Sequence, residues 1–161
     1  MSSYDAPVPS GGSVSRRVLR GFSPSALTEA RTRAGLTQGE LARIAGVGRT
    51  TLYQWEMGVR SPQVDVLASV ARALDISLSE LVSVPVDERF PGDWRVLRGL
   101  TQPQLGVAAG ISTTMVGAIE RGEAELSEQT ARALADALSV NETELRAAYR
   151  RARNRPTGTP A

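Results

Sequence analysis

Arginine is the charged side chain with which this sequence can recognise another molecule. All 19 positive charges in the 161 residues belong to arginine, because the sequence contains no lysine, and it has no histidine and no cysteine. These absences exclude disulfides, zinc and iron–sulfur sites, histidine acid–base catalysis and lysine Schiff bases. A guanidinium group remains suited to binding anions in a fixed planar geometry. We therefore expect a binding protein that is not an enzyme and needs no metal and no cofactor.

The arginines gather at the two ends of the chain. Arg16, Arg17 and Arg20 stand near the start, and five more arginines occupy positions 146, 150, 151, 153 and 155. Basic ends around a neutral or acidic centre are typical of a chain that binds an anionic partner, although such ends can also serve only solubility. No apolar run approaches about 18 residues and no signal peptide is evident, so we expect no membrane segment and a cytoplasmic protein.

The elements that position these side chains come from a unit that occurs twice. A shift of 64 residues aligns 31–81 with 95–145 without a gap, and 16 of these 51 positions are identical. Prolines and a lack of helical period mark a linker between the copies. The predicted organisation is a flexible N-terminal arm (1–22), a first unit (23–83), a linker (84–91), a second unit with an Arg-rich C-terminal helix (92–154) and a disordered tail (155–161).

Each unit is predicted to contain five short helices. Apolar residues recur at helical spacing, and no stretch alternates with period two, so the fold class is all-α. Leu41, Ile44 and Ala45 are expected on the buried face of the second helix. Capping residues predict the helix starts at Ser23-Pro24, Thr37-x-x-Glu40, Thr101-x-x-Gln104, Ser77-x-x-Glu80 and Asn141-x-x-Glu144, and the third helix of the first unit is expected from about Gly48 to Met57.

Two short helices around a glycine turn form a helix-turn-helix, and this pattern alone is weak evidence of DNA binding. The strings Gly35-Leu-Thr-Gln-x-x-Leu-Ala42-x-x-Ala45-Gly-Val47 and Leu52-x-x-Trp-Glu56-x-Gly58-x-Arg60-x-Pro62 make it specific. They resemble the Cro/CI (lambda-repressor-like, XRE) family over residues 25–82, and residues 91–146 resemble it more loosely. The resemblance implies two tandem five-helix lambda-repressor-like domains and a nucleoid-associated regulator, a repressor, that binds specific double-stranded DNA through the major groove.

The resemblance also assigns roles to residues of the first unit. Bases would be read by Arg49, Thr50 and Gln54, and the chemistry agrees, because arginine suits guanine, glutamine suits adenine and threonine suits a base edge or the thymine methyl. The DNA backbone would be contacted by Gln38, Thr51, Tyr53 and Arg60. Structural ion pairs would join Arg31 to Glu56 and Arg95 to Glu120. The alternative is an ordinary solvated helix face.

The second unit departs from the first where DNA contact would matter. Its outward positions are Thr114, Gly117, Ala118 and Arg121, and its loop contains Glu123 and Glu125 around Ala124, where the first unit has Arg60. Carboxylates repel phosphates, so we expect the second unit to serve mainly as a scaffold or partner site. A weaker second contact remains open for Gln102, Thr113, Thr114 and Arg121.

The partner of the chain is expected to be double-stranded DNA, and its oligomeric state is less defined. A short stripe of Leu145, Ala148, Tyr149 and Ala152 extends the last helix and would dock either on its own chain or on a second copy. The family commonly pairs through fifth-helix surfaces, so we expect a homodimer, with a monomer using both units as the alternative. The alternative function is a protein-interaction module, such as an antitoxin or an adaptor. No small-molecule effector domain is evident.

Overall fold

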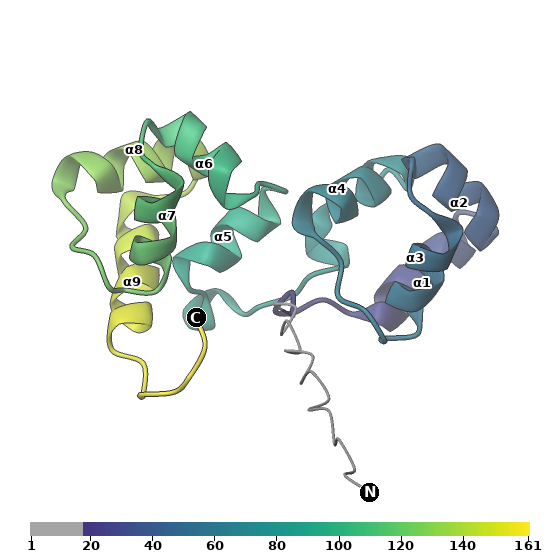
Figure 1. Cartoon of the computed structure of the whole chain (residues 1–161), viewed down its shortest axis with the longest axis horizontal. Coiled ribbons are helices and arrows are strands. Elements are labelled where there is room, and N and C mark those ends of the chain that lie inside the picture. Colours follow the sequence, from purple (N-terminus) through teal and green to yellow (C-terminus); the bar gives the residue numbers. More distant parts are fainter. Residues whose placement is uncertain (1–17) are drawn as a thin grey trace, which may run out of the picture.

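The computed structural model describes residues 18–161, which form two helical units side by side (Figure 1). The first unit contains α1 (Pro24–Arg33), α2 (Gln38–Ala45), α3 (Arg49–Glu56), α4 (Val64–Ala73) and the 3₁₀ turn η1 (Leu78–Glu80). The second contains α5 (Pro91–Leu97), α6 (Gln102–Ala109), α7 (Thr113–Glu120), α8 (Glu128–Leu138) and α9 (Glu142–Arg153), and the 3₁₀ turn η2 (Val86–Glu88) precedes it. The all-α prediction is confirmed. None of these helices combines the length and the apolar character that crossing a bilayer requires.

Side-chain caps fix where the two helix-turn-helix segments begin and turn. Thr37 Oγ1 accepts a hydrogen bond from the Glu40 backbone N–H, and the Glu40 carboxylate accepts one from the Thr37 N–H, which together form the predicted capping box. These bonds lower the pKa of Glu40 below its ordinary value. Gly46 ends α2 in the left-handed conformation at φ 71°, which glycine adopts without steric cost, so the chain can turn directly into α3.

Each unit has its own core of leucines and small residues. Leu27, Leu41, Leu52 and Leu67 are fully buried in the first unit, and Leu105, Ile119, Leu138 and Leu145 are nearly or fully buried in the second. The prediction that Ile44 is buried beside Leu41 was wrong, because Ile44 is 50% exposed. The inward arc of the eight-residue α2 is filled by Leu41 and Ala42, which leaves position 44 on the outside.

The fifth element of the first unit is shorter than the sequence predicted. Ser77 makes no cap bond to a backbone N–H, and its hydroxyl is hydrogen-bonded to that of Ser79 instead, so only the 3₁₀ turn η1 forms. In the second unit Asn141 does cap α9, by accepting from the Thr143 N–H, and the helix continues for 12 residues. The predicted five-helix unit is therefore complete only in the second copy.

The N-terminal arm predicted for residues 1–22 ends earlier than expected. Residues 1–17 lie outside the described part of the chain, but Leu19 N donates to Ser61 Oγ at 2.6 Å and Phe22 forms a β-bridge with Val82. Leu19 thus contacts the loop after α3, and Phe22 pairs with the end of the first unit. The predicted disordered tail is also anchored at its start, since Arg155 donates to the carbonyl oxygens of Arg121 and Ala152.

The two units contact each other through α5 on one side and α4 with η1 on the other. Val96 packs into the core of the first unit, and a Cβ added to Gly99 would lie 3.0 Å from the Ala68 Cβ. Arg20 Nη1 reaches across the junction to Asp93 Oδ2 at 2.7 Å. Burial raises the pKa of Asp93, although the Phe90 N–H and Arg20 oppose that effect. The predicted linker 84–91, whose last residue Pro91 already begins α5, is thus bordered by direct contacts between the units.

The last helix docks on its own chain. Leu145, Ala148 and Ala152 of α9 are no more than 1% exposed, and the Tyr149 hydroxyl donates to the Ala124 carbonyl at 2.7 Å. Of the two docking modes that the apolar stripe of α9 allowed, the structure shows the intramolecular one.

Candidate nucleic-acid interface

The outward face of α3 carries polar side chains that are free to meet another molecule. Arg49 and Thr50 are exposed at the first turn of the helix, Tyr53 is 49% exposed, and Gln54 is partly exposed. Leu52 and Trp55 point inward and are nearly fully buried. An eight-residue helix with one inward and one outward face is short enough to enter the major groove of DNA without burying its own core side chains.

A buried network holds α3 against α1 and α2. Arg31 Nε donates to Glu56 Oε1 at 2.7 Å, and Arg31 Nη1 donates to the Leu36 carbonyl at 2.9 Å. The side chains of Arg31 and Glu56 are only 16% and 3% exposed. The second carboxylate oxygen of Glu56 accepts a hydrogen bond from Gln38 Nε2. Glu56 thereby connects the end of α3 to two other helices.

Gln38 is oriented by this network and not simply solvated. One N–H of its amide is used by Glu56, and the amide nitrogen carries a second N–H that is available for an outside acceptor. Gln38 is also the first residue of α2, where free backbone N–H groups and the helix dipole favour an anion. The position suits a DNA phosphate, because the bond to Glu56 already orients the Gln38 amide before DNA binds.

The remaining backbone candidates of the first unit surround the same face. Thr51 is partly exposed on the first turn of α3, and Arg60 is exposed in the loop that follows the helix. The stem of Arg49 passes beside Gly39, where an added Cβ would lie 4.0 Å from Arg49 Cδ. Base-reading and phosphate-binding candidates thus share one surface made by α2, α3 and the following loop.

The second unit repeats the buried network but not the polar face. Arg95 donates to both carboxylate oxygens of Glu120, at 2.6 and 3.2 Å, and Gln102 Nε2 donates to Glu120 Oε2 at 2.9 Å. Thr113 and Thr114 are exposed at the start of α7. No residue between Gly99 and Ile119 is charged, so this helix-turn-helix offers DNA few charge-assisted bonds.

Gly117, predicted to lie on the outward face of α7, is covered by side chains of its own unit. A Cβ added there would meet Arg121 Nη1 at 3.0 Å and the Gln102 amide nitrogen at 3.6 Å. Arg121 therefore lies back across α7, and its Nε also pairs with Glu123 at 2.9 Å. Where the first unit has Tyr53, the second unit thus has a glycine that an arginine side chain covers.

Sequence reasoning missed the contact between Arg20 and Asp93 at the junction. Asp93 lies three residues after Phe90, where its carboxylate accepts from the Phe90 N–H at 2.8 Å. Proline at the first position of α5 followed by an acid two residues later was a readable signal of a helix start. Nothing in the sequence indicated that an arginine 73 residues away would reach this carboxylate.

Comparison with known proteins agrees with this geometry. A helix-turn-helix family model matches the chain twice, at residues 27–81 and 93–145. The transcriptional repressor RstR of the cryptic phage CTXphi from Vibrio cholerae is 29% identical over 83 residues, which cover 50% of this chain and 75% of RstR. A putative helix-turn-helix transcriptional regulatory protein of Methanocaldococcus jannaschii is 36% identical over 64 residues, which cover 38% of this chain and 20% of that protein.

The two family matches together cover more than half of the chain, so the chain belongs to the Cro/CI-type (XRE) helix-turn-helix family. It is a DNA-binding transcriptional regulator with two helix-turn-helix domains in tandem. The resemblance predicted from the sequence is confirmed.

Proposed function

We propose that this protein is a repressor that reads one DNA sequence with α3 of its first unit, while the second unit holds the same duplex without reading it. Arg49, Thr50 and Gln54 contact base edges, and Gln38, Thr51, Tyr53 and Arg60 contact the backbone. The protein acts in the cytoplasm, on the nucleoid. The single observation that carries the proposal is the exposed polar face of α3, held in place from behind by the bonds of Glu56 to Arg31 and Gln38.

The difference between the outward faces of α3 and α7 supports the proposal that only the first unit reads the sequence. Gln54 of the first unit corresponds to Ala118 of the second, and Tyr53 corresponds to Gly117. A methyl group and a hydrogen cannot donate to or accept from a base edge. Gln102, Thr113, Thr114 and Arg121 keep enough hydrogen-bonding capacity for contacts that position the duplex without specifying its sequence.

Substitution of the base-reading residues is expected to remove sequence preference. After an operator has been selected from a random pool, Arg49→Ala and Gln54→Ala should each weaken binding to it by about 1–3 kcal/mol and leave binding to a scrambled duplex nearly unchanged. Arg60→Ala and Gln38→Ala are the controls, and both should weaken the two duplexes equally. Fluorescence anisotropy at one fixed salt concentration measures all four. Unchanged operator affinity in both reading variants would exclude α3 as the reader.

We further propose that one chain binds as a monomer with both units, in place of the homodimer expected from the sequence. The surfaces available for fifth-helix pairing are covered within the chain, because Gly99 of the loop after α5 lies against Ala68 and Leu78, and the apolar face of α9 is buried. Native mass spectrometry should find a 17.1 kDa chain alone and one chain per operator duplex. Two chains on a duplex that holds a single operator would contradict the proposal.

A further inference from the structure

Four arginines at the end of the chain, at positions 150, 151, 153 and 155, form no ion pair within residues 18–161, and of these Arg151 turns back to the carbonyl oxygens of Arg89 and Val86. Arg150 and Arg153 are exposed on adjacent turns of α9, and Arg155 follows directly; none of the three forms an ion pair there. Arg146, one turn earlier, does pair with Glu142 at 2.9 Å. We call Arg150, Arg153 and Arg155 the α9 arginine cluster. Unneutralised positive charge held in one place attracts a polyanion.

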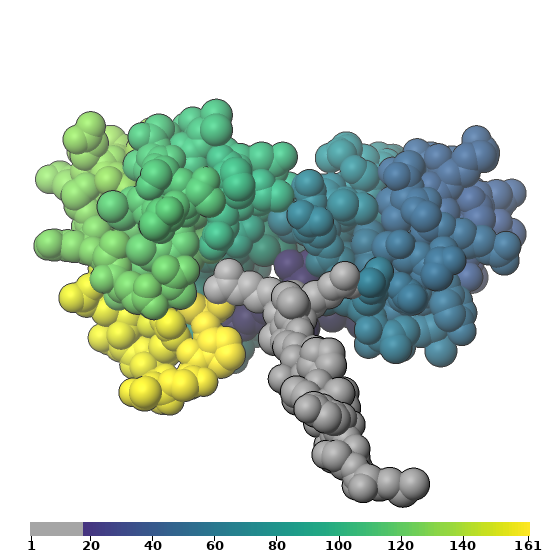
Figure 2. All heavy atoms as spheres, in the orientation of Figure 1, coloured from purple at the N-terminus to yellow at the C-terminus, as the bar shows by residue number. Residues whose placement is uncertain are grey.

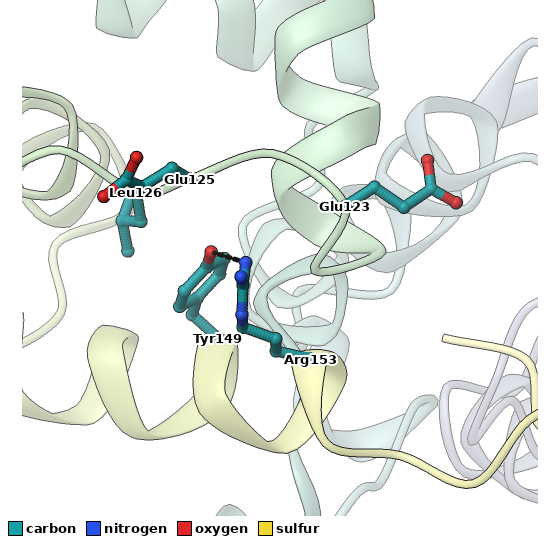
Figure 3. A pocket seen from close by; sticks show the side chains of 5 residues that line it. All are labelled: Glu123, Glu125, Leu126, Tyr149 and Arg153. Carbon is teal, nitrogen blue, oxygen red and sulfur yellow. Dashed lines mark hydrogen bonds between the residues drawn. The ribbon is translucent and has the colours of Figure 1, made fainter.

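Arg153 of this cluster is held in position by a close backbone contact with the loop after α7. A Cβ added to Gly122, in the loop after α7, would lie 2.6 Å from the backbone N and Cα of Arg153. Tyr149 donates to the Ala124 carbonyl of the same loop, and Arg153 Nη1 donates to the Tyr149 hydroxyl at 3.0 Å. Figure 3 shows Tyr149 and Arg153 rising together from α9 toward this loop. The last turns of α9 therefore present their arginines beside the end of α7.

The acids of the loop do not cancel this charge. Glu123 is paired with Arg121, and the carboxylates of Glu123 and Glu125 both point away from the Arg153 guanidinium (Figure 3). The corresponding loop of the first unit carries Arg60, which is lost as Ala124 in the second. The loop after α7 thus lacks the arginine of the first unit, but α9, which has no counterpart of its length in the first unit, carries arginines beside it.

The cluster also borders the first unit. Arg155 and Arg121 line a cleft of about 820 Å³ together with Arg20 and with the residues Pro62–Val64 that follow the loop of Arg60. Figure 2 shows the C-terminal segment at the lower edge of the second unit. Arg155 of the cluster and Arg20 thus line one cleft at the junction, which the carboxylates of Asp93 and Glu120 also line, and Arg20 is paired with Asp93 there.

We propose that the α9 arginine cluster is a second DNA-backbone site, which binds phosphates of the same duplex that α3 reads and replaces the loop arginine lost from the second unit. The inference rests on the proposed function, since it needs a duplex on the first unit. Guanidinium groups bind phosphate with charge-assisted hydrogen bonds and carry no sequence information there. The cluster adds affinity and salt dependence, but no sequence preference.

The salt dependence of binding to a scrambled duplex tests the site. Each neutralised phosphate contributes about 0.9 to the slope of log K against log salt concentration, so Arg150→Ala/Arg153→Ala should lower the magnitude of that slope by about 2. Both side chains are exposed, so the fold should survive; circular dichroism checks it. The matched control is Arg72→Ala/Arg132→Ala, which removes the same charge from exposed positions on α4 and α8 and should leave the slope unchanged.

The outcomes separate this inference from the proposed function. Operator and scrambled affinities should fall by the same factor in Arg150→Ala/Arg153→Ala, while Arg49→Ala lowers operator affinity alone. An unchanged slope in the α9 variant would overturn the inference, and so would an equal loss of slope in the control. If either happens while Arg49→Ala still lowers the preference for the operator, the proposed function stands. Absence of duplex binding in the wild-type protein would overturn both.

Discussion

Glu56→Ala is expected to lower the free energy of unfolding of the first unit by about 3–5 kcal/mol, because it strands the guanidinium of Arg31 in a buried site. Arg31 is 16% exposed and would keep only the Leu36 carbonyl at 2.9 Å as a partner. Gln38 would lose its acceptor at the same time. Because this carboxylate joins α3 to α1 and α2 in addition to the packing of Leu52 and Trp55, its loss should also loosen the reading face and lower its affinity for the operator.

Urea unfolding followed by tryptophan fluorescence measures the effect on the first unit. Trp55 is buried in the first unit and Trp94 lies in the second, so a Trp94→Phe background makes Trp55 the only reporter. Glu29→Ala, which removes an exposed acid from α1, is the control and should change stability by no more than about 0.5 kcal/mol.

A double variant separates a stranded charge from lost packing. Replacing a buried ion pair by apolar residues of similar volume is often neutral, so Arg31→Met/Glu56→Met should be more stable than Glu56→Ala. If the double variant instead unfolds as easily as the single one, the loss comes from packing or shape and the argument from the buried charge is wrong.

Gly122→Ala is expected to destabilise the second unit by about 2–5 kcal/mol. The residue has φ 70°, a left-handed conformation that costs a residue with a Cβ about 1–2 kcal/mol. The new methyl would in addition lie 2.6 Å from the backbone of Arg153 and 2.9 Å from the Ala152 carbonyl carbon. Backbone atoms cannot swing aside, so the last turn of α9 must shift, and such overpacking costs about 1–3 kcal/mol.

Gly58→Ala is a matched control for the backbone conformation. Gly58 holds the same place in the first unit with φ 71°, but a Cβ there would meet only Pro24 Cγ at 3.6 Å, an ordinary contact. Gly58→Ala should therefore lower the stability of the first unit only by the cost of the left-handed conformation. Thermal unfolding by circular dichroism compares the two, and hydrogen exchange of the last turn of α9 should rise only in Gly122→Ala. Equal losses in the two variants would mean that α9 is not held by this close approach.

Local sequence was sufficient for the helix-turn-helix elements. The capping residues of α2 lie within four positions of one another, and the apolar spacing around Leu52 defines one buried face of α3, so both could be predicted without tertiary information. The family string was specific because it combines such local signals at fixed distances. Ile44 was misassigned because an eight-residue helix has too few positions to define its inward arc by spacing alone.

The duplicated sequence therefore determined the class of protein, the two units and the outward face of α3 that we propose as the DNA-reading face. Only the tertiary structure decided the setting of that face: Arg20 reaching Asp93, Gln38 joining the buried pair, and α9 closing on Gly122. The physical reason is the separation of the interacting groups along the chain. Caps and helical faces depend on neighbours within a few residues, whereas these contacts join groups 18 to 73 residues apart. Such long-range contacts form because, once the helices have packed, a buried unpaired charge or an empty gap is costly in free energy.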